Sequence, residues 1–276
     1  TPFSVTVRRR GNAYDIDVDG LQAPLMRVRG YTMAEKGPLP PEKRFPEPQE
    51  DRPVAFPPVL AQASGAGFMA QVARADATDD VPAYLTYDER LELTQRGTLK
   101  RQADRIAGRV AAKRALSALT GVDPLDIRVL TAPSGEPIAR VPGERDVRVS
   151  VSHRDGHAVA VAVRGARVGI DLEGVEPRSE SFTSQWLSDG ERALAGEDAV
   201  RTNLVWSAKE AVLKALGTGM AIAPRFVQVT ALGDGTVDIA LEGPALDRHR
   251  ELGGGELLVR WERVGPEVCV QADLAA

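Results

Sequence analysis

Two carboxylates stand two residues apart in the segment Gly169–Glu173, where they could bind one cation together. If the segment is a strand, Asp171 and Glu173 point to one face and the apolar residues beside them point to the other. The carboxylates are then about 7 Å apart along the backbone. Hard oxygen ligands without a neighbouring histidine or thiolate favour magnesium, above all where substrate phosphates complete its coordination. The alternative is a surface strand with a solvated charged face, and the pair alone leaves both interpretations open.

An aromatic ring, a carboxylate and an ammonium recur at four-residue steps in a second segment, at Trp206, Glu210 and Lys214. On a helix this spacing places the three side chains in one column, which could face a polar site. The alternative is an intrahelical pair between Glu210 and Lys214, worth roughly 0.2–0.5 kcal/mol, with Trp206 packed in the core.

A histidine follows a serine at the predicted end of a strand, in the pair Ser152-His153. Because imidazole titrates near neutrality, His153 could be a general base. It could also donate a hydrogen bond to a phosphate, or close a turn, and its position alone does not separate these roles.

Two helices are predicted where apolar residues recur with a helical period. The first covers 100–119, with Gly121 as a left-handed cap, and the second covers 203–216 and ends before Gly217. One face of the first helix carries a cation every four residues, at Arg101, Arg105, Arg109 and Lys113. This basic face is a candidate anion site, and the alternative is an ordinary solvated face.

Short strands are predicted after each helix. They are expected at 147–152, 158–163, 168–173, 226–231, 236–241 and 257–261. Because a helix followed by short strands occurs twice, the sequence predicts an α+β fold with two similar halves.

The chain ahead of these elements differs in composition. Alternating residues predict strands within residues 1 to about 35, and eight prolines between Gly37 and Pro58 favour an extended linker. We therefore expect an N-terminal segment with its linker at 1–80. The main domain is expected at 81–276, with lobes at about 81–165 and 166–276.

Composition excludes several classes of protein. The chain has 276 residues and a single cysteine, Cys269, which rules out an internal disulfide framework and a cysteine-based zinc cluster. No apolar run approaches the roughly 20 residues of a membrane span, and no signal peptide opens the chain, so we expect a soluble, cytoplasmic protein. The net charge of -4 gives no general attraction to nucleic acid. The start at Thr1 suggests a piece of a longer chain.

Three segments in this order resemble the 4'-phosphopantetheinyl transferase superfamily. They are Ser152-His153, Gly169–Glu173, and Trp206–Ala211 followed by Lys214 and Gly217. The match runs from about Leu85 to about Ala272, which favours the larger, monomeric, Sfp-type branch. The resemblance implies two pseudo-symmetric lobes, each a long helix packed on a small, mostly antiparallel sheet, with the active site at their interface.

The resemblance also implies the reaction. Enzymes of this family transfer the 4'-phosphopantetheine group of coenzyme A to a serine of an acyl or peptidyl carrier protein and release adenosine 3',5'-bisphosphate. Asp171, Glu173 and Glu210 resemble the triad that binds Mg²⁺, which bridges to the pyrophosphate. Glu210 resembles the residue that takes, or helps to take, the proton of the acceptor serine. Lys214 resembles the lysine that steadies the pyrophosphate as charge moves to the leaving group.

Coenzyme A binding is implied for a further set of residues. His153 resembles the histidine that contacts the 3'-phosphate, and Arg105 resembles the cationic segment beside the nucleotide. Arg109, Ser152 and Lys209 are expected to bind coenzyme A with them.

One position departs from the family pattern. Relatives commonly have Gly-Lys-Pro before the histidine strand, and Gly135-Glu136-Pro137 stands here. The turn is kept while its cation is lost, so either another cation such as Arg140 or Arg154 replaces it, or the affinity for coenzyme A is lower than usual.

The N-terminal segment has a resemblance of its own. Gly30-Tyr31 with Gly37–Glu42 resembles the end of a dehydratase-like domain of a type I polyketide synthase, and such synthases can carry a transferase at their C-terminus. The acceptor would then be a carrier domain of the same megasynthase. The alternative is an unrelated extension.

Two other functions use the same residues. A metal-dependent phosphodiesterase or nuclease would also need carboxylates and a basic face, and it should bind nucleic acid with strong salt dependence. A non-catalytic module that binds a carrier protein would not need the metal triad. We expect the transferase, with a carrier protein as its partner and neither nucleic acid nor a membrane.

Overall fold

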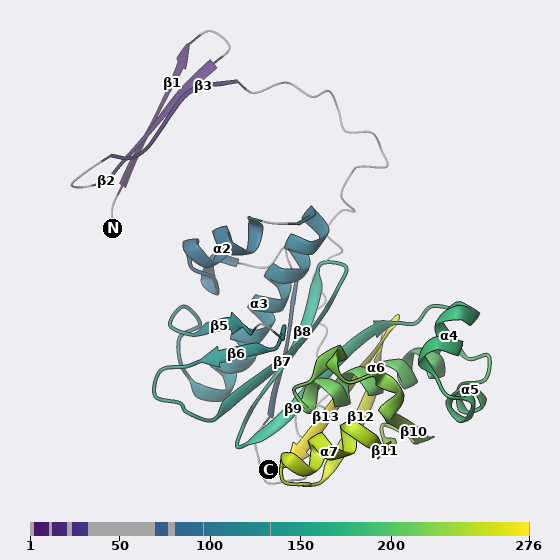
Figure 1. The fold of residues 1–276 in the computed structure, drawn as a ribbon. Helices are drawn as coiled ribbons and strands as arrows, with labels where there is room; N and C mark the ends of the chain where they lie inside the picture. Colours follow the sequence, from purple (N-terminus) through teal and green to yellow (C-terminus); the bar gives the residue numbers. More distant parts are fainter. Residues whose placement is uncertain are drawn as a thin grey trace. The chain divides into compact units, whose positions relative to one another are not determined.

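The computed structural model describes residues 3–10, 13–20, 24–32, 70–76, 81–95, 97–132 and 134–275. The chain divides into two compact units, Thr1–Val54 and Ala55–Ala276 (Figure 1). The proline-rich linker predicted between Gly37 and Pro58 lies outside the described residues.

The first unit contains three strands in one antiparallel sheet. These are β1 (Phe3–Arg10), β2 (Ala13–Gly20) and β3 (Pro24–Thr32), in the order β1-β2-β3. The strands predicted from residue alternation near the N-terminus are confirmed.

The first lobe of the second unit is a long helix on a three-stranded antiparallel sheet of order β4-β8-β7, with a separate β5-β6 hairpin beside it (Figure 1). Its elements are β4 (Ala70–Asp76), η2 (Val81–Ala83), α2 (Tyr87–Thr94), α3 (Leu99–Thr120), β5 (Arg128–Thr131), β6 (Pro137–Arg140), β7 (Val147–Arg154) and β8 (His157–Arg164). The sequence predicts that the main domain starts at Val81, but strand β4 of this sheet lies before that residue.

Helix α3 begins and ends where the sequence predicts. The side chain of Thr98 accepts a hydrogen bond from the amide of Arg101, and Gly121 ends the helix in the left-handed region at φ 75°. Its buried face is rich in alanine, and the facing residues Ala158, Ala160 and Ala162 of β8 are fully buried. Small residues on both surfaces allow helix and sheet to pack closely.

The second lobe repeats this plan. Its elements are β9 (Ala166–Gly174), α4 (Glu180–Trp186), α5 (Asp189–Ala195), α6 (Ala199–Ala215), η3 (Gly219–Ala221), η4 (Pro224–Phe226), β10 (Val227–Leu232), β11 (Val237–Leu241), α7 (Gly243–Glu251), β12 (Leu257–Val264) and β13 (Glu267–Ala275). The antiparallel sheet has the order β12-β13-β9, and α6 packs on β9 and β13. The α+β fold with a long helix on a small sheet in each lobe is therefore confirmed.

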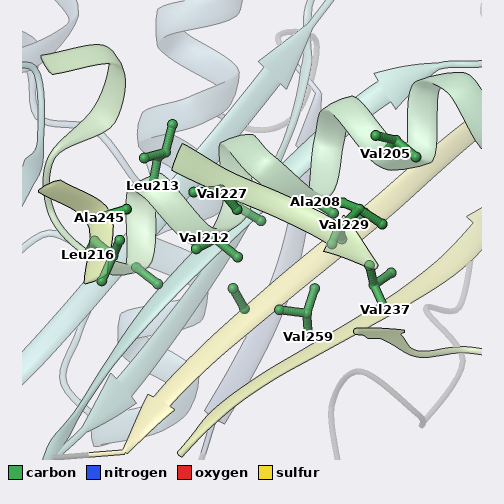
Figure 2. Packing of buried hydrophobic residues seen from close by; sticks show 14 of the residues in the cluster. Val205, Ala208, Val212, Leu213, Leu216, Val227, Val229, Val237, Ala245 and Val259 are labelled. Carbon is green, nitrogen blue, oxygen red and sulfur yellow. The ribbon is translucent and has the colours of Figure 1, made fainter. Parts of the chain in front are cut away.

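The core of the second lobe lies between α6 and the strands. Figure 2 shows Val205, Ala208 and Val212 of α6 near Val229 of β10 and Val259 of β12, and all five are buried. Across the other face of β9, Ile170 and Leu172 pack with buried valines of β8, so the two lobes share an apolar contact. No helix among the described residues has the length and apolar character that a bilayer crossing needs.

Candidate active site

A close approach between β9 and α6 creates the site. Residue 169 must be glycine, because a Cβ there would lie 1.8 Å from the carbonyl oxygen of Ala211. Ala208, Ala211 and Ala215 keep the facing side of the helix small and are fully or almost fully buried. Polar side chains one turn apart on α6 therefore reach the backbone and carboxylates of β9.

Asp171 is the centre of this contact. It is buried, and its Oδ1 accepts hydrogen bonds from Lys214 Nζ at 2.6 Å and Ser152 Oγ at 3.0 Å. Its Oδ2 accepts one from Ser207 Oγ at 2.8 Å. Lys214 also donates to the carbonyl oxygen of Ile170 at 3.0 Å. Asp171 is therefore no part of a solvated strand face, and Lys214 of α6 pairs with it within the second lobe.

Glu173 lies two residues further along β9, half-buried on the same face. Trp206 Nε1 donates to its Oε1 at 3.1 Å, and Arg178 Nη2 donates to its Oε2 at 2.6 Å. Burial is the largest cause that raises the pKa of Glu173, and the neighbouring charge of Asp171 adds to it. The Trp206 side of the helical column thus faces the strand.

Glu210 completes the column between Trp206 and Lys214. It forms no hydrogen bond or ion pair with the part of the chain that the structure describes. Its pKa is raised, first by burial and then by the charge of Asp171, while Lys214 acts in the opposite direction. The three predicted metal ligands, Asp171, Glu173 and Glu210, therefore lie in one electrostatic neighbourhood.

Two serines join the lobes next to this cluster. Ser150 Oγ accepts from the amide of Ile170 at 3.1 Å, and Ser152 Oγ accepts from the amide of Leu172 at 3.2 Å. Strands β7 and β9 are not paired in one sheet, so these hydroxyls satisfy backbone donors that a neighbouring strand would otherwise bond. Ser152, predicted to bind coenzyme A, thus fixes both the lobe interface and Asp171.

Asp171, Glu173 and Glu210 have the ligand chemistry that magnesium prefers. All three offer hard oxygen donors, and the raised pKa values of Glu173 and Glu210 reflect buried negative charge that a cation would offset. No group of three or more His, Cys, Asp or Glu side chains among the described residues is gathered into a metal-binding cluster. Lys214 and Arg178 contact two of the three carboxylates instead.

A cleft of about 520 Å³ lies beside α3 and contains the predicted nucleotide-binding cations. Arg105, Arg109 and the exposed His153 line it together. Gly108 makes room for this arrangement, because a Cβ there would lie 3.3 Å from Val151 Cγ1 and 3.5 Å from the His153 ring. Arg105 also donates twice to the carbonyl oxygen of Leu93, so it anchors the end of α2 as well as lining the cleft.

Two lysines of the predicted functional segments lie elsewhere. Lys209 is fully buried, and its ammonium pairs with Glu191 of α5 at 2.7 Å, so the structure does not bring it to the cleft beside α3. Lys113, last in the basic column of α3, is also fully buried and pairs with Glu89 of α2 at 2.8 Å. Both ammonium groups connect helices, because a buried charge needs a partner.

A second cleft, of about 460 Å³, lies between the lobes and shares Gly135, Pro137 and Val151 with the first. Glu136, at the position where the family resemblance implies a lysine, lies 3.5 Å from Arg167 Nη2 in this cleft. Among the described residues that line it, five are cations and two are acids. The cations are Arg140, Arg145, Arg148, Arg167 and Lys214, and the acids are Glu136 and Asp146. Arg140, one predicted replacement for the lost lysine, lies here.

Three residues of the cluster are absent from the sequence-based prediction: Ser150, Ser207 and Arg178. Ser207 lies beside Trp206 in the segment Trp206–Ala211, which carries the family resemblance, so its position in the sequence could have identified it. Ser150 shares the alternation of β7 with Ser152. Arg178 lies in an irregular stretch after β9, and no spacing pattern points to it.

Three comparisons bear on these residues. The sequence model of the 4'-phosphopantetheinyl transferase superfamily matches residues 167–261. The 4'-phosphopantetheinyl transferase Sfp of Bacillus subtilis (strain 168) is 30% identical over 159 residues, which cover 55% of this chain and 70% of that protein. A crystal structure of a holo-(acyl-carrier-protein) synthase from Bacillus anthracis str. Ames in complex with CoA (3',5'-ADP) is 29% identical, covers 34% of this chain and 93% of that chain, and has a TM-score of 0.31.

The matched residues include β9 and α6, which carry the carboxylate cluster. The relative from Bacillus subtilis is covered over more than two thirds of its length. On this sequence similarity, the chain belongs to the 4'-phosphopantetheinyl transferase superfamily.

Proposed function

We propose that this chain transfers the 4'-phosphopantetheine group of coenzyme A to a serine of an acyl or peptidyl carrier protein. The observation that carries the proposal is the convergence of Asp171, Lys214, Glu173 and Glu210 at the contact of β9 with α6. A cleft with three further imidazole or guanidinium groups lies on the same chain beside β7.

The nucleotide end of coenzyme A is proposed to bind in the cleft beside α3. Its 3'-phosphate and pyrophosphate are anions, and Arg105, Arg109 and His153 offer guanidinium and imidazole donors to them there. Burial lowers the pKa of Arg109, but the guanidinium remains charged near neutral pH.

Asp171, Glu173 and Glu210 are proposed to hold Mg²⁺. Bound there, the cation would neutralise the pyrophosphate and stabilise the charge that develops on the leaving group. Lys214 serves the same purpose without a metal, because its ammonium already lies at the cluster and can donate to a phosphate oxygen.

The serine hydroxyl of the carrier attacks the phosphorus that bears the pantetheine arm. The bond from that phosphorus to the bridging oxygen breaks, and adenosine 3',5'-bisphosphate leaves with the bonding electrons. We assign the serine proton to Glu210, either directly or through a group that it orients. In the metal-free chain, burial and then the charge of Asp171 raise the pKa of Glu210, which favours uptake of a proton at this carboxylate.

A phosphodiesterase or nuclease and a non-catalytic carrier-binding module remain the competing functions. Incubation with coenzyme A, Mg²⁺ and an apo carrier protein, followed by intact mass measurement of the carrier, separates all three. The transferase adds one phosphopantetheine group to the carrier. A nuclease leaves the carrier unchanged and cleaves added nucleic acid, whereas a binding module changes neither.

A further inference from the structure

The Glu173 carboxylate is held from both sides. Trp206 donates to Oε1 at 3.1 Å, while Oε2 receives Arg178 at 2.6 Å and Arg154 at 3.4 Å. Three donors thus contact a single side chain at the end of β9. This differs from Glu210, which forms no hydrogen bond with a described residue although it lies in the same neighbourhood.

Arg178 is itself fixed by a buried amide. Its Nε donates to Asn203 Oδ1 at 2.5 Å, and Asn203 of α6 is fully buried. The Asn203 amide nitrogen in turn donates to the carbonyl oxygens of Glu176 at 2.7 Å and Ala199 at 2.8 Å. Nε of the guanidinium is therefore anchored to α6 while Nη2 holds the Glu173 carboxylate. The group is rigid and planar, so it can make both contacts in one conformation.

Aromatic rings pack against the Arg178 guanidinium and against the Trp206 indole. The Arg178 guanidinium carbon lies 4.9 Å from the ring centre of Phe182. The rings of Phe182 and Trp186 in α4 lie 5.2 Å and 5.4 Å from the Trp206 ring. The two short contacts to Glu173 are thus supported by one packed unit from the segment between β9 and α6.

Arg154 contributes less to this arrangement. Its contact with Glu173 is longer, and it also pairs with Glu176 and Asp155. Its guanidinium lies over Gly174, where a Cβ would approach its Cζ to 2.7 Å. No buried side chain among the described residues anchors it as Asn203 anchors Arg178.

We propose that Arg178 is a positioning residue for this transferase: it holds the Glu173 carboxylate in the place from which that group binds the divalent cation. The inference rests on the proposed function, because Glu173 is a metal ligand only there. Glu173 has three rotatable side-chain bonds, and Arg178 fixes the end that must bind. Loss of a residue that orients a metal ligand typically lowers metal affinity or activity by about 10–100-fold.

The test is Mn²⁺ binding, followed by electron paramagnetic resonance of the free ion, with saturating coenzyme A and no carrier protein. Arg178→Ala is expected to weaken Mn²⁺ binding by about 10–100-fold. Arg178→Lys keeps the charge but loses the fork that reaches Asn203 and Glu173 together, so it is expected to recover only part of the affinity. Arg192→Ala removes an exposed arginine that pairs with Asp189 in the same lobe, and it should bind Mn²⁺ as the parent does.

Urea unfolding of each variant shows whether a loss of Mn²⁺ affinity comes from the orientation of Glu173 or from a loss of stability. Arg178→Lys is the decisive variant if Arg178→Ala does not fold. Parent-like Mn²⁺ affinity in a folded Arg178 variant overturns the inference and leaves the proposed function intact. An equal loss in Arg192→Ala overturns it as well. If the parent binds no Mn²⁺, or binds it equally well as Asp171→Ala, the proposed metal site fails together with the inference.

Discussion

At the scale of single residues, three carboxylates lie in one electrostatic neighbourhood and have unequal partners. Asp171 accepts from two hydroxyls and an ammonium, and Glu173 accepts from an indole and two guanidinium groups. Glu210 has no such bond to a described residue, and its pKa is raised by burial and by Asp171. A buried carboxylate that Lys214 offsets only in part is what a catalytic or metal-binding role requires and what stability disfavours.

Glu210→Gln should therefore stabilise the metal-free protein near neutral pH while it lowers transfer. A carboxyl whose pKa is higher in the folded state than in the unfolded state favours folding only while it is protonated. That contribution is lost as pH rises from the unfolded value of about 4.5 through the higher folded value. Thermal unfolding in the absence of metal should show a melting temperature a few degrees above the parent near pH 7, since about 1 kcal/mol corresponds to roughly 2–4 °C in a domain of this size.

The advantage of Glu210→Gln should shrink toward about pH 4, where both proteins carry a neutral side chain. A melting temperature at neutral pH equal to or below that of the parent would show that burial of the charged Glu210 carboxylate does not lower the stability of the protein.

The cleft beside α3, where the nucleotide of coenzyme A is proposed to bind, leads to a prediction about coenzyme A as the donor substrate. His153→Ala and Arg105→Ala should raise KM for coenzyme A much more than for dephospho-coenzyme A, because only the former has the 3'-phosphate. Arg105 also holds the carbonyl oxygen of Leu93, so its variant needs a parallel unfolding measurement. Equal losses of kcat/KM for both donors would return His153 to the role of a possible general base.

At the scale of elements, helix α6 has two polar functions on different faces. The column of Trp206, Glu210 and Lys214 meets β9, whereas Lys209 points into the core and pairs with Glu191. Glu191 also accepts from the amides of Ser188 and Val229, so it connects α5 with β10. Lys209 is therefore part of the scaffold that presents the neighbouring Glu210.

Lys209→Met should destabilise the protein by about 3–5 kcal/mol, because removing one partner leaves Glu191 buried without its counter-ion. Urea unfolding measures this. The fraction that remains folded should bind coenzyme A with the parent affinity. Lys113→Met, which breaks the matching buried pair with Glu89 in the other lobe, is the control and should behave alike. Weaker coenzyme A binding in Lys209→Met alone would restore the role that the family resemblance implies.

Residue periods predicted the two long helices and most strands of the second unit, and they missed several short helices and one central strand. Helices α3 and α6 and strands β7, β8 and β9 were predicted to within a few residues. The short helix α5 was missed, although Ser188 with Glu191 forms a capping box that is visible in the sequence. Strand β13 was missed despite its alternation, although it is the central strand of its sheet.

The direction of individual side chains limited how much of the candidate site could be predicted from the sequence. The column on α6 and the acidic pair on β9 could be predicted from four-residue and two-residue spacing. The burial of Lys209 could also have been read, because it follows Val205 by four residues and precedes Val212 by three on the apolar stripe. The contact of Arg178 with Glu173 could not, since it depends on how an irregular segment returns to α6.

At the scale of the molecule, basic groups gather around the clefts of an acidic chain. The inter-lobe cleft is lined by more cations than acids although the net charge of the whole chain is -4. Arg140 and Arg145 are exposed there, and neither forms an ion pair with a described residue. An acidic carrier surface would be attracted to this region before it makes contact.

Raising salt from low to physiological ionic strength should therefore lower kcat/KM for the carrier, as the screening length falls toward about 8 Å. The measurement uses saturating coenzyme A and varies only the carrier, because the phosphates of coenzyme A also respond to salt. Arg140→Glu combined with Arg145→Glu should lower kcat/KM for the carrier and flatten its salt dependence. A parent rate that does not change with salt would exclude electrostatic recruitment.

The central claim is that transfer to the carrier takes place at the carboxylate cluster between β9 and α6. The direct measurement is the rate at which apo carrier protein gains the mass of one phosphopantetheine group, for the parent, Asp171→Ala and Glu210→Ala. Circular dichroism must show that each variant is folded. We predict that the parent modifies the carrier when coenzyme A and Mg²⁺ are present and that both variants lose the activity by at least about 10²-fold. A folded variant that modifies the carrier at near the parent rate would contradict the account.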